Sequence, residues 1–164
     1  HDPHSLIFYC ADEGILISAD ALWENGFGVI FPELDGGSGF LEARATLDLI
    51  ASLDVRVVIP GHGRPFQDAA GALQRAYSRL DYLSSDPVRN AQNAVKVLLK
   101  FLLLERQRIA LAAIPALLRG MPIFEEANRR FLRLEAAALA EWAVSQLVRA
   151  AAARVEGEYL LNEG

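Results

Sequence analysis

The chain has 164 residues, of which 52% are hydrophobic and 23% are charged, a composition typical of a globular protein with one sizeable core or two small ones. No run of 18 or more apolar residues is present, so the sequence predicts no membrane span, and a formal net charge of −5 argues against a nucleic-acid partner. The single cysteine, Cys10, excludes an internal disulfide and is typical of a reducing compartment, so we expect a cytoplasmic protein with Cys10 as a buried structural thiol.

The acidic residues are concentrated in the first half of the chain. Residues 1–89 hold 6 Lys and Arg against 13 Asp and Glu, whereas residues 90–164 hold 10 against 8. Together with the helix-breaking sequence Ser-Ser-Asp-Pro at 84–87, this change predicts a domain boundary that separates residues 1–86 from residues 87–164. Because the first residue is histidine rather than methionine, we expect the sequence to begin inside a longer protein.

The first elements expected along the chain are two short strands. Residues 6–10 and 15–17 are apolar stretches of strand-forming residues, and a four-residue turn with a glycine, residues 11–14, separates them. This spacing predicts an antiparallel hairpin. Asp20 follows the second stretch closely, so its carboxylate is expected just past the end of a strand.

A loop, a helix and a third strand are expected next. Residues 24–39 are rich in glycine and aromatic residues without a regular period, which predicts a long loop that lines or covers a site. Residues 40–53 have the apolar spacing of an amphipathic helix, and residues 55–59 form a strand-like run that ends in Pro60. His62 then stands between two glycines, in a turn that presents its imidazole at the end of a sheet. The first half is therefore predicted to be α/β.

The rest of the chain is expected to be largely helical. Its composition favours helices, with a stop at Gly120 and Pro122. The final stretch could form a short strand or wing, and three helices with a small β element would resemble a winged-helix module. The expected helices cover residues 68–83, with Asp68 or a neighbour as the N-cap, and residues 91–105, 109–119 and 124–154 with internal breaks, and the short strand or wing covers residues 156–161.

Three side chains in loops that flank strands could hold a metal ion. His1, Asp20 and His62 provide two imidazoles and a carboxylate, the donors that zinc takes in proteins, and a carboxylate can also bridge two cations. A metal ion held in this way lowers the pKa of bound water enough to supply hydroxide near neutral pH, and it polarises the bond to be cleaved. The chemistry expected of such a site is hydrolysis.

Three short stretches form a set of motifs that is more specific than any one of them. They are His-Asp-Pro-His-Ser at residues 1–5, Leu-Ile-Ser-Ala-Asp at residues 16–20, and Ile-Pro-Gly-His-Gly at residues 59–63. In order and spacing they resemble the last three metal-ligand motifs of the metallo-β-lactamase fold superfamily, with Ala19 in place of the usual glycine. The resemblance covers roughly residues 1–85.

The resemblance implies a binuclear metallohydrolase. His1 would bind the first metal ion, Asp20 would bridge both, and His62 would bind the second; the two divalent ions are expected to be zinc, with iron or manganese as alternatives. Members of the family fold as an αββα sandwich of two similar halves, so the chain resembles the second half followed by an all-helical, winged-helix-like domain. The family's upstream His-x-His-x-Asp-His motif is absent from the sequence. We therefore expect an incomplete site, weak metal binding and no activity from this chain alone.

Several functions remain open at this point. The resemblance favours hydrolysis of a small-molecule thioester, lactone or other ester, with nuclease activity as an alternative and a non-enzymatic binding module as a third reading. An incomplete sandwich should expose an apolar sheet face, so we expect pairing with the missing N-terminal half of the fold or with a second copy of the chain in a homo-oligomer.

Other side chains allow two interpretations each. Asp20 could instead cap a turn, and His4 is expected to face solvent or to support the site rather than to bind metal. Four aromatic residues of the first half could line a pocket or form the core of the long loop, and three arginines of the second half are interpreted as a solvated face rather than an RNA patch. These residues are Trp23, Phe27, Phe31 and Phe40, and Arg129, Arg130 and Arg133.

Overall fold

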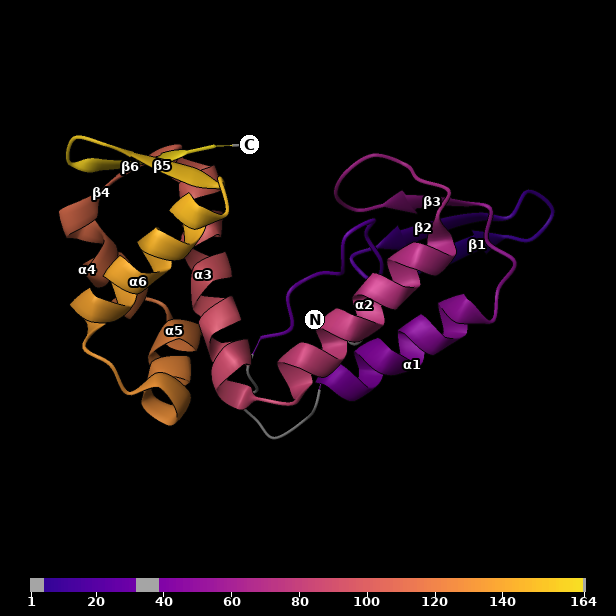
Figure 1. The fold of residues 1–164 in the computed structure, drawn as a ribbon, viewed down its shortest axis with the longest axis horizontal. Coiled ribbons are helices and arrows are strands. Elements are labelled where there is room, and N and C mark those ends of the chain that lie inside the picture. The colour runs from indigo at the N-terminus through magenta and orange to yellow at the C-terminus, as the bar shows by residue number, and fades with distance from the viewer. Residues whose placement is uncertain (1–4, 32–38, 164) are drawn as a thin grey trace. The chain divides into compact units, whose positions relative to one another are not determined.

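The chain folds into two compact units, residues 1–86 (unit 1) and residues 87–164 (unit 2) (Figure 1). The computed structural model describes residues 5–31 and 39–163. Two of the singled-out histidines, His1 and His4, lie outside the described residues. Within the described part of the chain, no helix has both the length and the apolar character needed to cross a membrane.

Unit 1 is a three-stranded sheet with two helices packed against one of its faces (Figure 1). Leu16 and Val58 of the sheet are fully buried and form one cluster with side chains of both helices. This α/β arrangement agrees with the fold class expected for the first half. The elements are β1 (Phe8–Cys10), β2 (Ile15–Ala19), α1 (Gly39–Ala51), β3 (Val57–Pro60) and α2 (Ala69–Ser84), and the strand order is β1-β2-β3.

The pairing of the strands brings two of the singled-out loops together. Strands β1 and β2 form the expected antiparallel hairpin, with Tyr9 opposite Leu16. Strands β2 and β3 run parallel, with Leu16 opposite Val58. Since parallel strands have their carboxyl ends at the same edge of a sheet, the residues that follow β2 and β3 are neighbours there. The backbone N–H of Gly61 donates to the carbonyl of Ala19 at 2.7 Å, which ties the two strand ends together.

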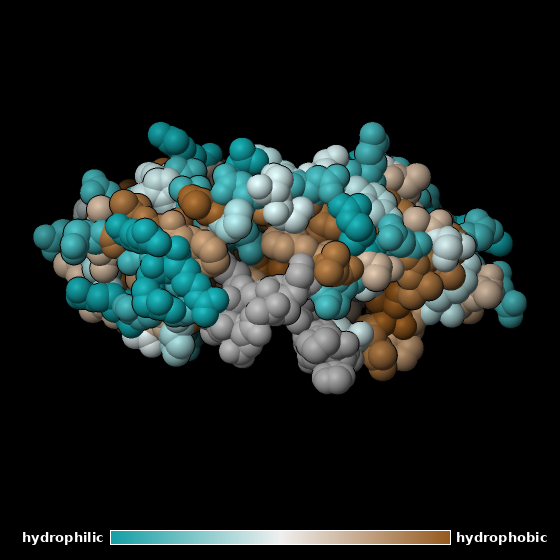
Figure 2. All heavy atoms as spheres, turned by 90° about the horizontal axis from the view of Figure 1, so that it is seen from below, coloured by the Kyte–Doolittle hydropathy of each residue, from teal (hydrophilic) through white to brown (hydrophobic). Residues whose placement is uncertain are grey.

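The sheet face opposite the helices exposes an apolar row. Phe8 lies opposite Ile17, and Ile17 lies opposite Ile59, so that one side chain from each strand forms a continuous row across the sheet. Their exposed fractions are 62%, 47% and 39%. Figure 2 shows hydrophobic residues exposed on the surface of unit 1. An exposed apolar face of this kind is what the sequence predicts for one half of a sandwich.

Cys10 is exposed, which corrects the expectation of a buried thiol. The residue lies two positions after Phe8 in β1, and side chains two apart in a strand point to the same face. The sequence predicted the strand but could not indicate which of its faces is covered. Cys10 therefore belongs to the uncovered apolar face of the sheet.

Helix α2 begins at the predicted cap and is fastened to α1. The Asp68 carboxylate accepts from the backbone N–H of Gly71 at 2.9 Å, which confirms Asp68 as the N-cap. The Tyr77 hydroxyl on α2 donates to Asp48 Oδ1 on α1 at 2.6 Å. Burial of the phenol, followed by its hydrogen bond to Asp48 and the charge of that carboxylate, raises the pKa of Tyr77 to about 12.

Replacing Tyr77 with phenylalanine is expected to lower the free energy of unfolding by about 1 kcal/mol at neutral pH, because one hydrogen bond is lost. A tyrosine with a raised folded-state pKa contributes stability that is complete below its ordinary pKa of about 10 and is lost as the pH rises through about 12. The stability of the wild-type chain should therefore fall more steeply than that of Tyr77→Phe over this range. Urea unfolding at a series of pH values measures the difference, and parallel profiles would contradict it.

Unit 2 combines helices with a second three-stranded sheet (Figure 1). Its two antiparallel pairs give the strand order β4-β6-β5. The Lys100 ammonium donates to Asn162 Oδ1 at 2.7 Å and to the carbonyls of Ala152 and Glu163, which holds the end of the chain against the first helix of the unit. The elements are α3 (Pro87–Arg106), β4 (Arg108–Ala110), the 3₁₀ turn η1 (Leu111–Ala113), α4 (Ile114–Arg119), α5 (Pro122–Ala127), the π-helical turn η2 (Asn128–Leu132), α6 (Ala136–Arg149), β5 (Ala153–Glu156) and β6 (Tyr159–Asn162).

Unit 2 is not all-helical, which corrects the expectation for the second half. The helix expected at residues 109–119 begins as strand β4, where Ile109 pairs with Leu160 and both side chains are buried. The helix expected at residues 124–154 is divided by η2 and by Arg133, whose φ of 51° is left-handed, and its last residues form β5. The short strand expected at residues 156–161 corresponds to β6. The two strands that pair with it, β4 and β5, were not predicted.

Candidate metal centre

Asp20 and His62 lie side by side at the carboxyl edge of the first sheet. Asp20 directly follows β2 and His62 follows β3, and Asp20 Oδ1 is 3.6 Å from His62 Nε2. This distance is longer than a hydrogen bond, so the two side chains do not hydrogen-bond to each other. Both side chains are accessible, with exposed fractions of 44% for Asp20 and 72% for His62. The pair could therefore take part in binding a cation.

The pair does not complete a metal site by itself. Within residues 5–31 and 39–163, no group of three or more His, Cys, Asp and Glu side chains is placed to hold an ion. The third expected ligand, His1, lies outside the described residues. A carboxylate and an imidazole suit a borderline cation such as zinc, which needs four ligands in a closed site and three in a catalytic one. The described donors thus fit the implied metal in kind but fall short in number.

Two glycines shape the space around Asp20. A Cβ atom at Gly28 would lie 2.8 Å from Asp20 Cβ, and a Cβ atom at Gly61 would lie 2.9 Å from Asp20 Oδ1. A side chain at either position would displace the carboxylate. The sequence singled out Gly61 through its motif, but Gly28 stands in a stretch without regular period, and no pattern pointed to it.

The backbone just before Asp20 is strained. Ala19 has a φ of 47°, in the left-handed region, which costs a residue with a Cβ atom about 1–2 kcal/mol. The strand register also shifts between Ile17 and Ala19. The glycine that the resemblance leads one to expect at this position would adopt this conformation without strain. The conformation turns the chain so that Asp20 faces the loop after β3. No helix begins within residues 21–31, so any cap that Asp20 provides is that of a turn and not of a helix.

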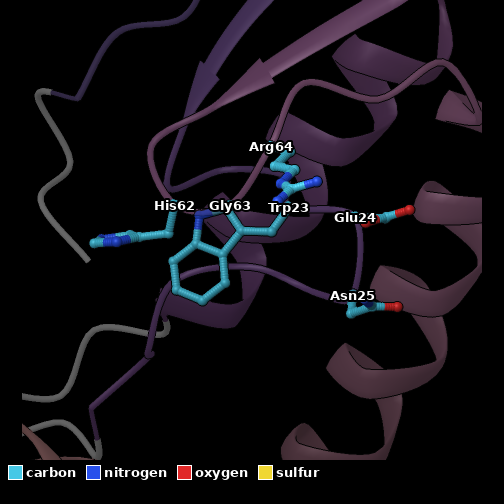
Figure 3. A pocket seen from close by; sticks show the side chains of 6 residues that line it. All are labelled: Trp23, Glu24, Asn25, His62, Gly63 and Arg64. Carbon is cyan, nitrogen blue, oxygen red and sulfur yellow. The ribbon is translucent and has the colours of Figure 1, made fainter. Parts of the chain in front are cut away.

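Trp23 lies against His62. The two rings meet edge to face, with centroids 5.1 Å apart and an interplanar angle of 76°. Figure 3 shows the indole beside His62 and Gly63, in an open pocket that Glu24, Asn25 and Arg64 also line. Of the four aromatic residues with two interpretations, Trp23 therefore lines a pocket. Phe27, with an exposed fraction of 5%, belongs to the core.

Two of the three arginines that were interpreted as a solvated face share one carboxylate. Arg129 and Arg130 both form ion pairs with Glu126, and Arg129 also donates hydrogen bonds to that carboxylate. These hydrogen bonds, chiefly from Arg129, hold the pKa of Glu126 below its ordinary value. Because one carboxylate offsets part of their charge, the interpretation as a solvated face is favoured over an RNA-binding surface.

The family match lies within unit 1, whereas the match to a solved structure covers nearly the whole chain. Residues 1–62 match the sequence model of the metallo-beta-lactamase superfamily, and this match includes both Asp20 and His62. A solved structure of a metallo-beta-lactamase family protein from Thermus thermophilus is 21% identical, with a TM-score of 0.40, and the match covers 96% of this chain and 44% of that one. The chain thus spans less than half the length of that protein. No curated protein matches the chain.

Proposed function

We propose that this chain supplies part of a binuclear metallohydrolase centre, in which Asp20 bridges two divalent ions and His62 binds one of them. The observation that carries the proposal is the 3.6 Å approach of Asp20 to His62 at the ends of two parallel strands, within the residues that match the metallo-beta-lactamase superfamily. His1 would be a further ligand. Zinc is the first candidate, and when bound it supplies a nucleophilic water at neutral pH and polarises the bond to be cleaved.

The remaining ligands would come from the first half of the same sandwich fold. The exposed row of Phe8, Ile17 and Ile59 supports this proposal, because it offers an apolar sheet face of the kind that a second layer covers. In the absence of that half, two copies of the chain would pair through the row. The site of this chain alone would be incomplete and inactive.

Replacing Ile17 with lysine is expected to turn a dimer of this chain into a monomer, because the new charge stands in the middle of the apolar row. Size-exclusion chromatography with light scattering measures the mass. Leu49→Lys is the matched control, since Leu49 is an equally exposed apolar residue on α1, away from the sheet. A wild-type chain that is monomeric at high concentration would contradict the pairing.

The charges favour an ester over a nucleic acid as substrate. A thioester, lactone or other small ester does not require a basic surface, whereas nucleases hold phosphates with unpaired Lys and Arg. The first half of the sequence is acidic, and Glu126 pairs with Arg129 and Arg130 in the second half. Nuclease activity therefore remains the second candidate.

Unit 2 is proposed to be a winged-helix-like module. Support comes from its element order, in which a helix, a strand, further helices and a terminal hairpin follow one another, and from the strand order β4-β6-β5. This assignment of unit 2 rests on an analogy at the level of the fold. A non-enzymatic binding module is the alternative.

The decisive experiment extends the chain upstream by a first half that carries the His-x-His-x-Asp-His motif. Metal analysis is expected to find two ions per protein, and assays with thioesters, lactones and RNA are expected to show ester hydrolysis. A protein that binds no metal and cleaves none of the three would overturn the proposal and favour the binding module. The unextended chain should bind zinc weakly and remain inactive.

A further inference from the structure

The orientation of His62 depends on very few contacts. The residues on both sides of it are glycines, and a Cβ atom at Gly63 would meet nothing within 4 Å. Its side chain is 72% exposed. Its side chain approaches Asp20, at 3.6 Å, and meets the ring of Trp23. Because Asp20 does not hydrogen-bond to it, the indole is the larger restraint on the imidazole.

The loop that carries Trp23 is itself folded onto Asp20. The backbone N–H of Trp23 donates to the carbonyl of Gly26 at 2.7 Å, which closes a tight turn. Two residues later, the N–H of Gly28 donates to the carbonyl of Asp20, also at 2.7 Å. One short segment, residues 23–28, thus lies against both candidate ligands.

Helix α2 anchors this segment through two arginines. Arg75 Nε donates to the carbonyl of Glu24 at 2.8 Å, next to Trp23 in the chain. One turn later on the helix, the Arg79 guanidinium lies 5.8 Å from the ring centroid of Phe27. Because the two contacts are on a helix that packs in the core, they hold the segment against unit 1.

We propose that Trp23 is a positioning residue that sets the ring orientation of His62, and that Arg75 holds the segment carrying Trp23. This inference rests on the proposed function, in which His62 binds a metal ion. A metal-binding imidazole must be held in one orientation, and such supporting contacts change metal affinity when they are removed. Trp23 Nε1 is buried and has no hydrogen-bond partner among the described residues, so the contact with His62 is between the two rings and not a conventional hydrogen bond.

The contact is tested first in this chain, without metal, by NMR of the histidine ring protons. Trp23→Leu removes the aromatic ring and is expected to move the His62 resonance, which is assigned as the one missing from His62→Gln. Trp142→Phe is the control, because it changes the other tryptophan of the chain, in α6 of unit 2. An unmoved His62 resonance in Trp23→Leu would overturn the inference whatever the metal experiments show.

The consequence is tested in the upstream-extended protein by zinc titration against a competing chelator. Trp23→Leu is expected to lower the affinity for one of the two zinc ions by about 10–100-fold. Arg75→Met is expected to lower the affinity for the same ion by a smaller factor. Trp23→Phe keeps a ring without the N–H and should retain most of the affinity. Arg44→Met is the matched control for Arg75, since Arg44 pairs with Asp81 between the helices and its loss affects stability only.

The outcomes separate the two proposals. If the unsubstituted extended protein binds no zinc, the proposed function fails, and the inference fails with it. If that protein binds two ions and Trp23→Leu binds both with unchanged affinity, the inference fails while the proposed function stands. A loss of affinity equal in Trp23→Leu and Arg44→Met would reflect folding and would also overturn the inference.

Discussion

His62→Ala in the upstream-extended protein is expected to bind one metal ion in place of two and to lose about a thousandfold in kcat/KM. A catalytic metal contributes several kcal/mol to stabilising the transition state, and each 1.36 kcal/mol corresponds to a factor of ten in rate. His62 is exposed and lies in a loop, so its removal leaves the buried cluster of unit 1 intact. The folding midpoint should therefore change little while the metal content falls.

The controls for this prediction are in the same region of the chain. Gln67→Ala changes an exposed residue in the same connection between β3 and α2 and should leave metal content and rate unchanged. Asp20→Asn keeps the size of the side chain but removes the charge that would bridge the ions. It should therefore weaken the binding of both ions. Asp12→Asn, in the exposed turn of the hairpin, is the control for Asp20→Asn and should leave metal binding unchanged. Two ions retained in His62→Ala would contradict the assignment of His62 as a ligand.

The approach of Asp20 to His62 could be predicted because it depends on strands, and strands leave a pattern in sequence. Each residue follows a short apolar run, and the motif resemblance implied that both residues belong to one metal site. The contact between Trp23 and His62 depends instead on a turn closed by Gly26 and on Arg75 of α2, which bonds to Glu24, 51 residues earlier in the chain. Such a contact arises from tertiary packing, and no local pattern records it.

Strands β4 and β5 of unit 2 were not predicted, for a related reason. Strand β4 has three residues and stands in an alanine- and leucine-rich stretch that also fits a helix. It forms only because Ile109 pairs with Leu160, about 50 residues further along the chain, where burial of both side chains decides the conformation. Local propensity carries no information about a partner so far away.

Phe124→Ala is expected to lower the free energy of unfolding of unit 2 by about 3–5 kcal/mol, the usual cost of truncating a buried phenylalanine. Phe124 is fully buried, and its short helix α5 packs against α3 and α4. Trp142 on α6 is the tryptophan of unit 2, so its fluorescence in a Trp23→Phe background follows the unfolding of that unit in urea. Phe101→Ala is the matched control, because Phe101 lies on α3 with an exposed fraction of 50% and should cost less than about 1 kcal/mol. If both variants lost the same free energy of unfolding, Phe124 would not be a core residue of unit 2, and the prediction would be contradicted.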